Sequence, residues 1–461
     1  MKKNKNWSLR VFSQSPILLI AIAIIGFLIS LVFFYPGYRS PDSEWQLCQA
    51  LSQCDMDSWH PISMTVVWKV LLRVTGGFVP MMLILQLLMF WAGALLFSLW
   101  VWQRTRKWQL AILPLALGFL PNVLNIIGVI WKDVQMASAL LLATGLVINT
   151  YNSKKTWLKI VGAVVSFMLL AYATSVRTNA IFAVLPLIVL FVSSYNKPPK
   201  PFQKALTIAL IAVSLVSVNP LLNVIFKPQP GPSASTMYAY DIVNILPASR
   251  IADEAPEQIR PALLAISRCS IENNQRTNLT FWNCISQNEV ISSFGGGSLS
   301  VLKSYWLSTV KSYPLRYISQ KIETYIQFIF SDDGQSVWSN GGDIFSQDGI
   351  YNRYNSSISR SLRSVVYGYT MDFGYKYFSF IYKPWFWLLA ALTLMIYAKR
   401  LKEYRLWVYL LCASAIMYIL SYAPGSLTSD YRYIYWSVVS VLIAGIVTTV
   451  GRSKYAKRNR L

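Results

Sequence analysis

Long apolar segments recur along this chain, and they decide what it can fold into. Each run of about 17–20 residues with few charges is long enough to cross a bilayer core of roughly 30 Å. Of the 461 residues, 13% are charged and 54% are hydrophobic, which is too little charge to cover a soluble protein of this length. The sequence therefore predicts an all-α polytopic membrane protein with about ten transmembrane helices. The predicted spans are Ile17–Tyr35, Val79–Trp102, Trp108–Ile127, Val134–Asn149, Ile160–Ser175, Ala180–Ser194, Ala205–Phe226, Pro384–Ala398, Leu406–Tyr422 and Tyr433–Val450.

The net charge of +23 is spread unevenly over the connections between these spans. In a soluble protein, so much positive charge would suggest nucleic acid as a partner. Here the N-terminal segment, every second connection and the C-terminal tail carry a large excess of Lys and Arg, with Glu403 as their one acid. The remaining connections are nearly neutral. This positive-inside pattern predicts that both termini are cytoplasmic, and it leaves no reason to expect a nucleic-acid partner.

The spans fall into two groups separated by a long polar stretch. Residues 1–226 form an N-terminal transmembrane module, and residues 384–461 supply the C-terminal transmembrane helices. Between them, residues 227–383 are about the size of a domain, and we expect one mainly helical extracytoplasmic domain there. The first outer loop, residues 36–78, is the other large outer piece. Its expected short helices are Trp45–Ser52 and Ile62–Val74.

Four of the five cysteines form two close pairs on the predicted outer side. Cys48 stands near Cys54, and Cys269 stands near Cys284. Short-loop disulfides are expected for such pairs in an oxidising compartment. Zinc ligation is the alternative, but neither pair has the CxxC spacing that is typical of zinc sites.

The first outer loop holds the densest group of chemically capable residues. Asp42 and Glu44 follow a span within a few residues, so their position is set, and they could act as a general base or bind a divalent cation. The alternative is a pair of solvated loop acids. His60, the single histidine, precedes a proline and could be structural instead of binding substrate. Lys69 and Arg73 share one helix face, on the side that usually avoids cations.

Three further outer turns carry charges in apolar surroundings. Lys132-Asp133 would be costly unless it faced a wet cavity, although a local ion pair is the alternative. Arg177-Thr178-Asn179 offers a guanidinium that suits a lipid-linked phosphate, with snorkelling to ordinary headgroups as the alternative. Asp430-Tyr431-Arg432-Tyr433 adds a second arginine of this kind, beside tyrosines that could equally belong to an interfacial belt.

The sequence lacks the motifs of several common enzyme and transporter classes. The chain has no glycine-rich loop of the P-loop type, so ATP-driven transport has no support. It also has no GxSxG and no HExxH sequence, and its single histidine excludes a histidine-rich metal site.

This assembly resembles the GT-C superfamily of membrane glycosyltransferases, which use polyprenyl-phosphate-linked sugars. Their pattern is a first transmembrane helix, a long outer loop with membrane-parallel helices and a catalytic acid, and a second acid in the next outer loop. Asp42 matches the first acid and Asp133 the second. The segment Asp57-Ser58-Trp59-His60-Pro61 looks like the corresponding loop of bacterial members, and the turns at Arg177 and Arg432 are also similar. Trp306, followed by Pro314 and Tyr317, is similar to the helix that precedes the later spans.

The resemblance implies a function in the cell envelope. It implies an inverting glycosyltransferase of the bacterial plasma (inner) membrane, with its active site toward the periplasm or exterior. Its partners would be membrane lipids, a polyprenyl-phosphate-linked sugar donor and a glycan or glycolipid acceptor. The second acid is a lone Asp beside Lys132, which leaves the use of Mg²⁺ or Mn²⁺ open. The expected catalytic residues are Asp42, Asp133 and Glu44, and the expected substrate-binding residues are Arg177, Arg432, Lys132, His60, Lys69, Arg73, Asn179 and Tyr433.

Other classes of function remain open at this point. A glycan polymerase or ligase would depend mainly on the outer arginines and much less on Asp42. A transporter or flippase of lipid-linked sugars would place charged or Gly/Pro-broken helices near the bilayer midplane. A non-catalytic assembly factor would tolerate the loss of the Asp42 charge.

Overall fold

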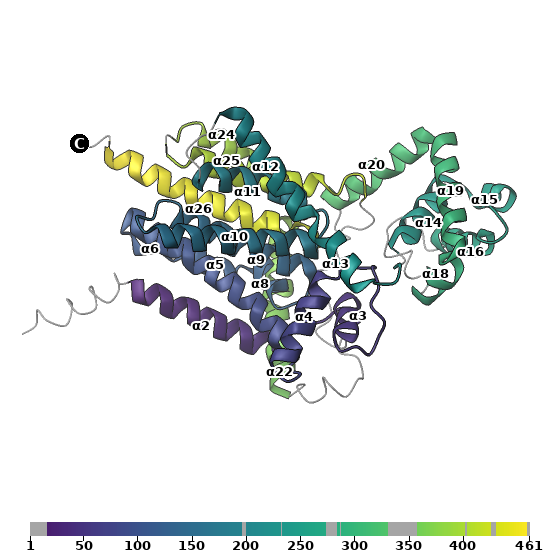
Figure 1. The fold of residues 1–461 in the computed structure, drawn as a ribbon, viewed down its shortest axis with the longest axis horizontal. Coiled ribbons are helices and arrows are strands. Elements are labelled where there is room, and N and C mark those ends of the chain that lie inside the picture. The colour runs from purple at the N-terminus through teal and green to yellow at the C-terminus, as the bar shows by residue number, and fades with distance from the viewer. Residues whose placement is uncertain are drawn as a thin grey trace, which may run out of the picture.

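The structure is a computed structural model, and it describes residues 16–195, 200–231, 233–272, 284–285, 287–330, 357–401, 403–425 and 430–458. The basic N-terminal residues Lys2–Arg10 lie outside the described residues. All regular elements in these ranges are helices, so the predicted all-α class is confirmed. Long helices run side by side along the molecule, and a separate helical domain stands at one end of the bundle (Figure 1). The long helices include α2 (Pro16–Phe34), α5 (Met81–Thr105), α9 (Lys132–Thr150), α10 (Thr156–Val176) and α26 (Tyr435–Arg458).

Every predicted span falls on an apolar helix or on consecutive apolar helices. Within the described residues, six helices are long and apolar enough to cross a membrane, or up to eight if two bent pairs each count as one span. The pairs are Trp108–Phe119 with Pro121–Ile127, bent by 52°, and Ser364–Tyr382 with Pro384–Ala398, bent by 58°. The other two predicted spans correspond to the shorter helices α11 (Ala180–Tyr195) and α25 (Arg405–Leu420). The multi-pass membrane architecture is therefore confirmed, whereas the number of ten crossings stays a prediction.

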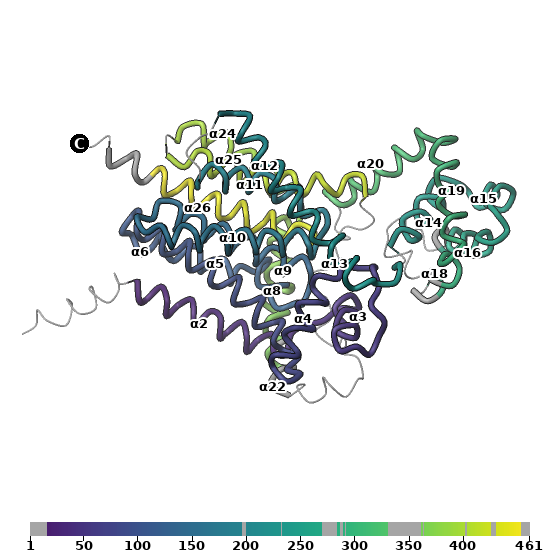
Figure 2. Tube along the Cα trace, in the orientation of Figure 1, coloured from purple at the N-terminus to yellow at the C-terminus, as the bar shows by residue number. Residues whose placement is uncertain are grey.

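The first loop forms two short helices, as expected. Figure 2 shows α3 (Pro41–Ala50) and α4 (Ser63–Val74) at the same end of the bundle as the helical domain. Helix α3 begins earlier than predicted because Pro41 favours the first helical position and the Ser43 hydroxyl accepts from the Ser40 amide at 3.3 Å. The predicted disulfides Cys48–Cys54 and Cys269–Cys284 are both present.

The helical domain has a hydrophobic core of its own. Buried side chains such as Tyr240, Leu263 and Phe294 form it, apart from the core of the bundle. The elements that enclose it are α14 (Ser233–Ile245), α15 (Ala248–Glu254), α16 (Arg260–Glu272), α18 (Gln287–Phe294) and α19 (Gly297–Ser312).

Helix α20 (Pro314–Phe330) connects this domain to the bundle. Lys321 of α20 donates to the buried Asp241 of α14 at 2.7 Å, and Phe328 belongs to the bundle core. Further along, η2 (Gly368–Tyr375) packs against α8 (Pro121–Ile127) of the bundle. The range 227–383 therefore contributes to both hydrophobic cores, and its two boundaries stay predictions.

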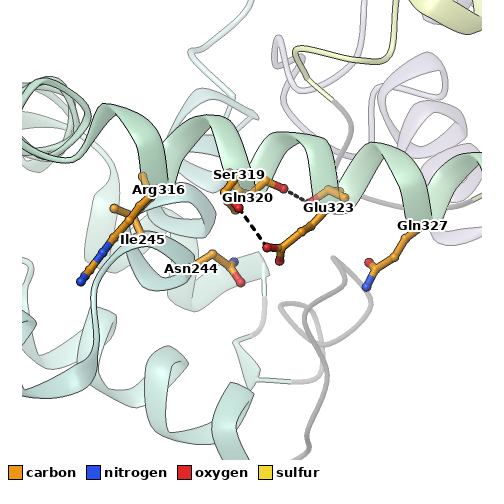
Figure 3. Close-up of a pocket in the computed structure, with 8 residues that line it drawn as sticks. Asn244, Ile245, Arg316, Ser319, Gln320, Glu323 and Gln327 are labelled. Atoms are coloured by element: carbon orange, nitrogen blue, oxygen red, sulfur yellow. Dashed lines mark hydrogen bonds between the residues drawn. The ribbon is translucent and has the colours of Figure 1, made fainter.

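A small polar cavity of about 260 Å³ lies between α14 and α20 (Figure 3). Asn244 and Ile245 line it from α14. The side chains of α20 that line it include Arg316 and Glu323, and Glu323 accepts a hydrogen bond from Ser319 at 3.1 Å. No cluster of charges converges there among the residues drawn.

An irregular segment joins α8 to α9, and the first loop holds it in place. The Tyr38 amide donates to the Gly128 carbonyl at 3.0 Å, and the Ile130 amide donates to the Tyr38 carbonyl at 2.8 Å. The fully buried Gln86 of α5 donates to the carbonyls of Ile127, at 2.6 Å, and Val129, at 3.0 Å. Non-helical backbone that is buried in a protein needs partners for its polar groups, and these bonds supply them. We call this arrangement of Tyr38, Gln86 and the segment 127–130 the loop clamp.

Two hydrogen bonds extend the clamp toward the start of α9. Ser43 donates its hydroxyl to the Ile130 carbonyl at 2.5 Å, and the Trp131 indole donates to the Ser40 hydroxyl at 2.6 Å. The first turn of α3 is thereby fixed beside the first turn of α9.

Gly128 provides a direct test of the clamp. A Cβ atom at this position would overlap the ring of Phe34, and the adjoining backbone hydrogen bonds prevent the segment from moving away. We expect Gly128→Ala to destabilise the protein by about 1–3 kcal/mol, the range for overpacking a dense core. The measurement is thermal unfolding of the purified protein in detergent. Gly445→Ala in α26 is the control, since no atom lies within 4 Å of its new methyl group. Equal transition temperatures for the two variants would contradict the prediction.

Candidate functional site

A cavity of about 620 Å³ lies where the first loop, the ends of several membrane helices and the start of α14 meet. Four of the predicted site residues line it: His60, Lys132, Arg177 and Asn179. The remaining lining residues are Ser58, Trp59, Pro61, Thr178, Asn219, Asn223, Ser233, Ala234, Met237, Ser421, Tyr422 and Gly425.

Asp42 lies at the start of α3 and is held by an arginine from the other end of the chain. Its Oδ2 atom accepts a hydrogen bond from Nη1 of Arg432 at 2.9 Å. Nε of the same guanidinium is 2.8 Å from Oδ2 of Asp430. The guanidinium also stacks over Trp131, with 4.9 Å to the ring centre. The Asp42 side chain remains 30% exposed, so it is accessible to a ligand.

His60 connects Asp42 to the cavity. Its Nε2 is 3.7 Å from Oδ1 of Asp42, and its Nδ1 is 2.6 Å from Nζ of Lys132. Burial, and then the positive charge of Lys132, lower the pKa of His60 to about 3, so the imidazole is neutral at physiological pH. Lys132 therefore donates to Nδ1, which places the imidazole hydrogen on Nε2, facing Asp42.

The charge state of Asp42 follows from its neighbours. Burial would by itself raise the pKa of this carboxyl, but the positive charges of Arg432 and Lys132 and the hydrogen bond from Arg432 outweigh burial. The pKa of Asp42 is held well below its usual range. The carboxylate is therefore ionised at neutral pH and is a weak base.

Lys132 brings positive charge to the cavity without a carboxylate partner. Within the described residues, no carboxylate oxygen lies within 4.0 Å of its Nζ atom, whereas Arg177 and Arg432 are each paired. It is also the first residue of α9, where the helix dipole adds positive potential. An anion bound in the cavity would lie near this charge.

Asp133 is buried and engaged by Arg177. Its side chain has no exposed surface, and Arg177 approaches both carboxylate oxygens, with Nε 3.2 Å from Oδ1 and Nη1 3.3 Å from Oδ2. Nη2 of Arg177 donates to the Tyr422 hydroxyl at 2.9 Å. Without exposed surface Asp133 cannot touch a substrate directly, which favours a role in holding Arg177.

Asn179 and Tyr433 complete the surroundings of Arg177. The Asn179 amide oxygen accepts from Nε of Arg177 at 3.1 Å, and its amide nitrogen donates to the Ser421 hydroxyl at 3.2 Å. The Tyr433 ring lies under the Arg177 guanidinium at 4.8 Å and stacks on Tyr422 at 4.9 Å. These contacts set the orientation of the guanidinium at the cavity wall.

Seven of the eleven predicted site residues do not line this cavity. Asp42, Asp133 and Tyr433 contact residues that line it, and Arg432 contacts Asp42. The other three are Glu44, Lys69 and Arg73. Glu44 is 3.8 Å from Arg39, and Lys69 donates to the Ser52 hydroxyl at 2.9 Å. Arg73 is exposed near the end of α4. Nothing in the structure tests their predicted roles.

Sequence reasoning missed two cavity residues that carried a readable signal. Asn219 and Asn223 lie four residues apart on α13 (Val218–Phe226), inside an otherwise apolar segment. Polar side chains that recur on one face of an apolar helix are expected to face a polar space.

The carboxylates of this site do not fit a divalent cation. Mg²⁺ and Mn²⁺ take most of their ligands from several oxygens at one point. The Asp42 carboxylate is already paired with Arg432, and the Asp133 carboxylate is paired with Arg177. The described residues also contain no group of three His, Cys, Asp or Glu side chains placed to share an ion.

No protein-family model matches this chain, and no curated protein matches it. Among solved structures, the archaeal oligosaccharyltransferase AglB from Archaeoglobus fulgidus, determined with an inhibitory peptide and a dolichol-phosphate, is similar with a TM-score of 0.41 and 12% identity. The superposition covers 96% of this chain and 52% of that chain, so this chain spans about half the length of that protein. A TM-score of 0.41 is too low to establish a common fold, and the resemblance to GT-C enzymes stays a prediction.

The pairing of Asp133 with Arg177 can be tested through stability. Asp133→Asn would leave a buried guanidinium without its counter-charge, and we expect a loss of about 3–5 kcal/mol. The double variant Asp133→Asn/Arg177→Met should recover much of this loss because it removes the orphaned charge as well. Thermal unfolding in detergent measures both, with Asp253→Asn at an exposed position of α15 as the control. If the double variant were less stable than Asp133→Asn, the pair would not be the structural unit described above.

Proposed function

We propose that this chain is a glycosyltransferase that moves a sugar from a polyprenyl-phosphate donor to a cell-surface glycan or lipid-linked acceptor. The observation that carries this proposal is the arrangement of Asp42, His60 and Lys132 beside the cavity. A carboxylate and an unpaired cation, bridged by a neutral imidazole, are the groups that displacement at a glycosyl phosphate needs. One accepts a proton, and the other stabilises the leaving phosphate.

Lys132 is the proposed ligand of the donor phosphate. Two unit charges 4 Å apart attract each other by about 4 kcal/mol at an effective dielectric constant of roughly 20. The N-terminus of α9 adds to this attraction. The cavity lies at the ends of apolar helices, which suits a donor whose lipid chain remains in the membrane.

Asp42 is the proposed proton acceptor. The acceptor hydroxyl oxygen forms a bond to the anomeric carbon while the bond from that carbon to the phosphate oxygen breaks. The hydroxyl proton passes to Asp42, and the bonding electron pair leaves with the lipid phosphate. Because Asp42 is a weak base, proton transfer occurs late, when the new bond has made the hydroxyl acidic. Attack on the face opposite the phosphate inverts the anomeric configuration.

The proposed orientation places the cavity and the helical domain outside the cell and both termini in the cytoplasm. Its support is the basic character of the helix ends away from the cavity. The cavity residue Arg177 follows α10, whereas Lys154 and Lys155 precede that helix. A bacterial plasma membrane, with the cavity toward the periplasm or exterior, is the proposed location.

The ion pairs that Arg177 and Arg432 form with carboxylates favour a transferase over a glycan polymerase or ligase. Such an enzyme would need arginines available for substrate, whereas Arg177 and Arg432 are already bound to carboxylates. Asp42, by contrast, keeps exposed surface.

Removal of the Asp42 charge tests the proposed chemistry. With a defined polyprenyl-phosphate sugar and purified protein, we expect Asp42→Asn to lower turnover by about 10²–10⁴-fold, the usual contribution of a positioned base. Asp55→Asn, at an exposed position of the same loop, is the matched control and should retain activity. Unchanged turnover in Asp42→Asn, with the protein folded, would remove the basis of the assignment.

The phosphate role of Lys132 predicts a charge-dependent loss. We expect Lys132→Gln to lower kcat/KM for the donor by about 10²–10³-fold, as for the removal of one group that stabilises developing charge. Lys132→Arg should retain more activity than Lys132→Gln because it keeps the positive charge. Lys311→Gln, exposed on α19, serves as the control. Equal activities for Lys132→Gln and the wild type would refute the role.

A further inference from the structure

Arg432 stands between two carboxylates that come from opposite ends of the chain. Nη1 donates to Asp42 at 2.9 Å, and Nε is 2.8 Å from Asp430. The three side chains are mostly shielded from solvent, with exposed fractions of 30% for Asp42, 12% for Asp430 and 15% for Arg432. One positive group therefore serves two negative groups at the edge of the candidate site.

The guanidinium is held on its faces as well as at its edges. Trp131 and Tyr433 lie 4.9 Å and 5.3 Å from it. Asp430 is itself fixed, because one of its oxygens accepts the Arg432 backbone amide at 3.0 Å. An arginine that is stacked and hydrogen-bonded in this way keeps its charge at all physiological pH values and does not swing freely.

His60 offers no ligand to a metal ion in this arrangement. Its Nδ1 accepts from Lys132, and its Nε2 carries the hydrogen that faces Asp42. A divalent ion placed on Asp42 would also meet the positive charges of Arg432 and Lys132 at close range, which opposes its binding.

We infer that Arg432 takes the place in which a divalent cation would bridge Asp42 and Asp430, and that this chain transfers sugar without a metal ion. The inference rests on the proposed function. The guanidinium occupies Oδ2 of Asp42 and leaves Oδ1 for the acceptor hydroxyl. Arg432 is therefore a positioning residue, and its guanidinium supplies a fixed positive charge in place of a metal ion.

Metal binding tests this inference without any activity measurement. Mn²⁺ is titrated into the purified protein and followed by electron paramagnetic resonance. We expect no bound Mn²⁺ that depends on Asp42 in the wild type. We expect Arg432→Ala to bind one equivalent, because two carboxylates lose their cation, and Asp42→Asn/Arg432→Ala to lose it again. Arg250→Ala is the control, since Arg250 also pairs with a carboxylate, Glu254 at 2.9 Å, but at an exposed position.

A transfer assay gives the second readout. Wild-type protein treated with excess EDTA should keep its full rate, and added Mg²⁺ or Mn²⁺ should not raise it. Loss of transfer in EDTA that Mn²⁺ restores would overturn the inference, as would wild-type Mn²⁺ binding that Asp42→Asn abolishes. If no donor supports transfer under any condition, the proposed function fails, while the Mn²⁺ titration still decides the inference. The Mn²⁺ titration and the EDTA assay of the wild-type protein still test the inference even if Arg432→Ala does not fold.

Discussion

Backbone hydrogen bonds from Tyr38 to Gly128 and Ile130 join the first outer loop to the segment between α8 and α9. These two segments carry Asp42 and Lys132 of the candidate site. Buried backbone must find its hydrogen-bond partners inside the protein, and here the partners are another extended segment and the buried Gln86. Since Tyr38, Gln86 and Val129 are buried, water does not compete for these bonds, and they determine where α3 and α9 begin relative to each other. The separation between the Asp42 carboxylate and the Lys132 ammonium follows from that register.

The charges of the site are distributed so that most of them are satisfied before any ligand arrives. Asp133, which is fully buried, and Arg177, which is 12% exposed, neutralise each other, and Arg432 is shared by Asp42 and Asp430. Buried charges of this kind are costly unless they are paired and hydrogen-bonded, which explains the tyrosines and asparagine around Arg177. Together the three carboxylates balance the charges of Arg177, Arg432 and Lys132, and Lys132 is the cation of this set that has no carboxylate within 4.0 Å among the described residues.

The neutral His60 lies between the Lys132 ammonium and the Asp42 carboxylate. It accepts from Lys132 on one side and presents a hydrogen toward Asp42 on the other. A protonated imidazole at this position would repel Lys132, and burial prevents it from forming. The ammonium can therefore lie close to the carboxylate without forming a direct ion pair, which keeps both groups available for substrates.

The sequence by itself was sufficient to predict the helical class, the apolar helices and both disulfides, although the number of membrane crossings stays a prediction. Hydropathy is sufficient for the spans because the bilayer accepts few other structures, and the Cys48–Cys54 and Cys269–Cys284 pairs are close in sequence. Asp42, Lys132, Arg177 and Arg432 could each be singled out because charges are rare beside apolar segments. Their partners could not be inferred. The contact between Asp42 and Arg432 joins helices from opposite ends of the chain, and the burial of Asp133 depends on where α10, α25 and α26 meet. Only tertiary packing decides such contacts, because local spacing carries no information about which distant helices become neighbours.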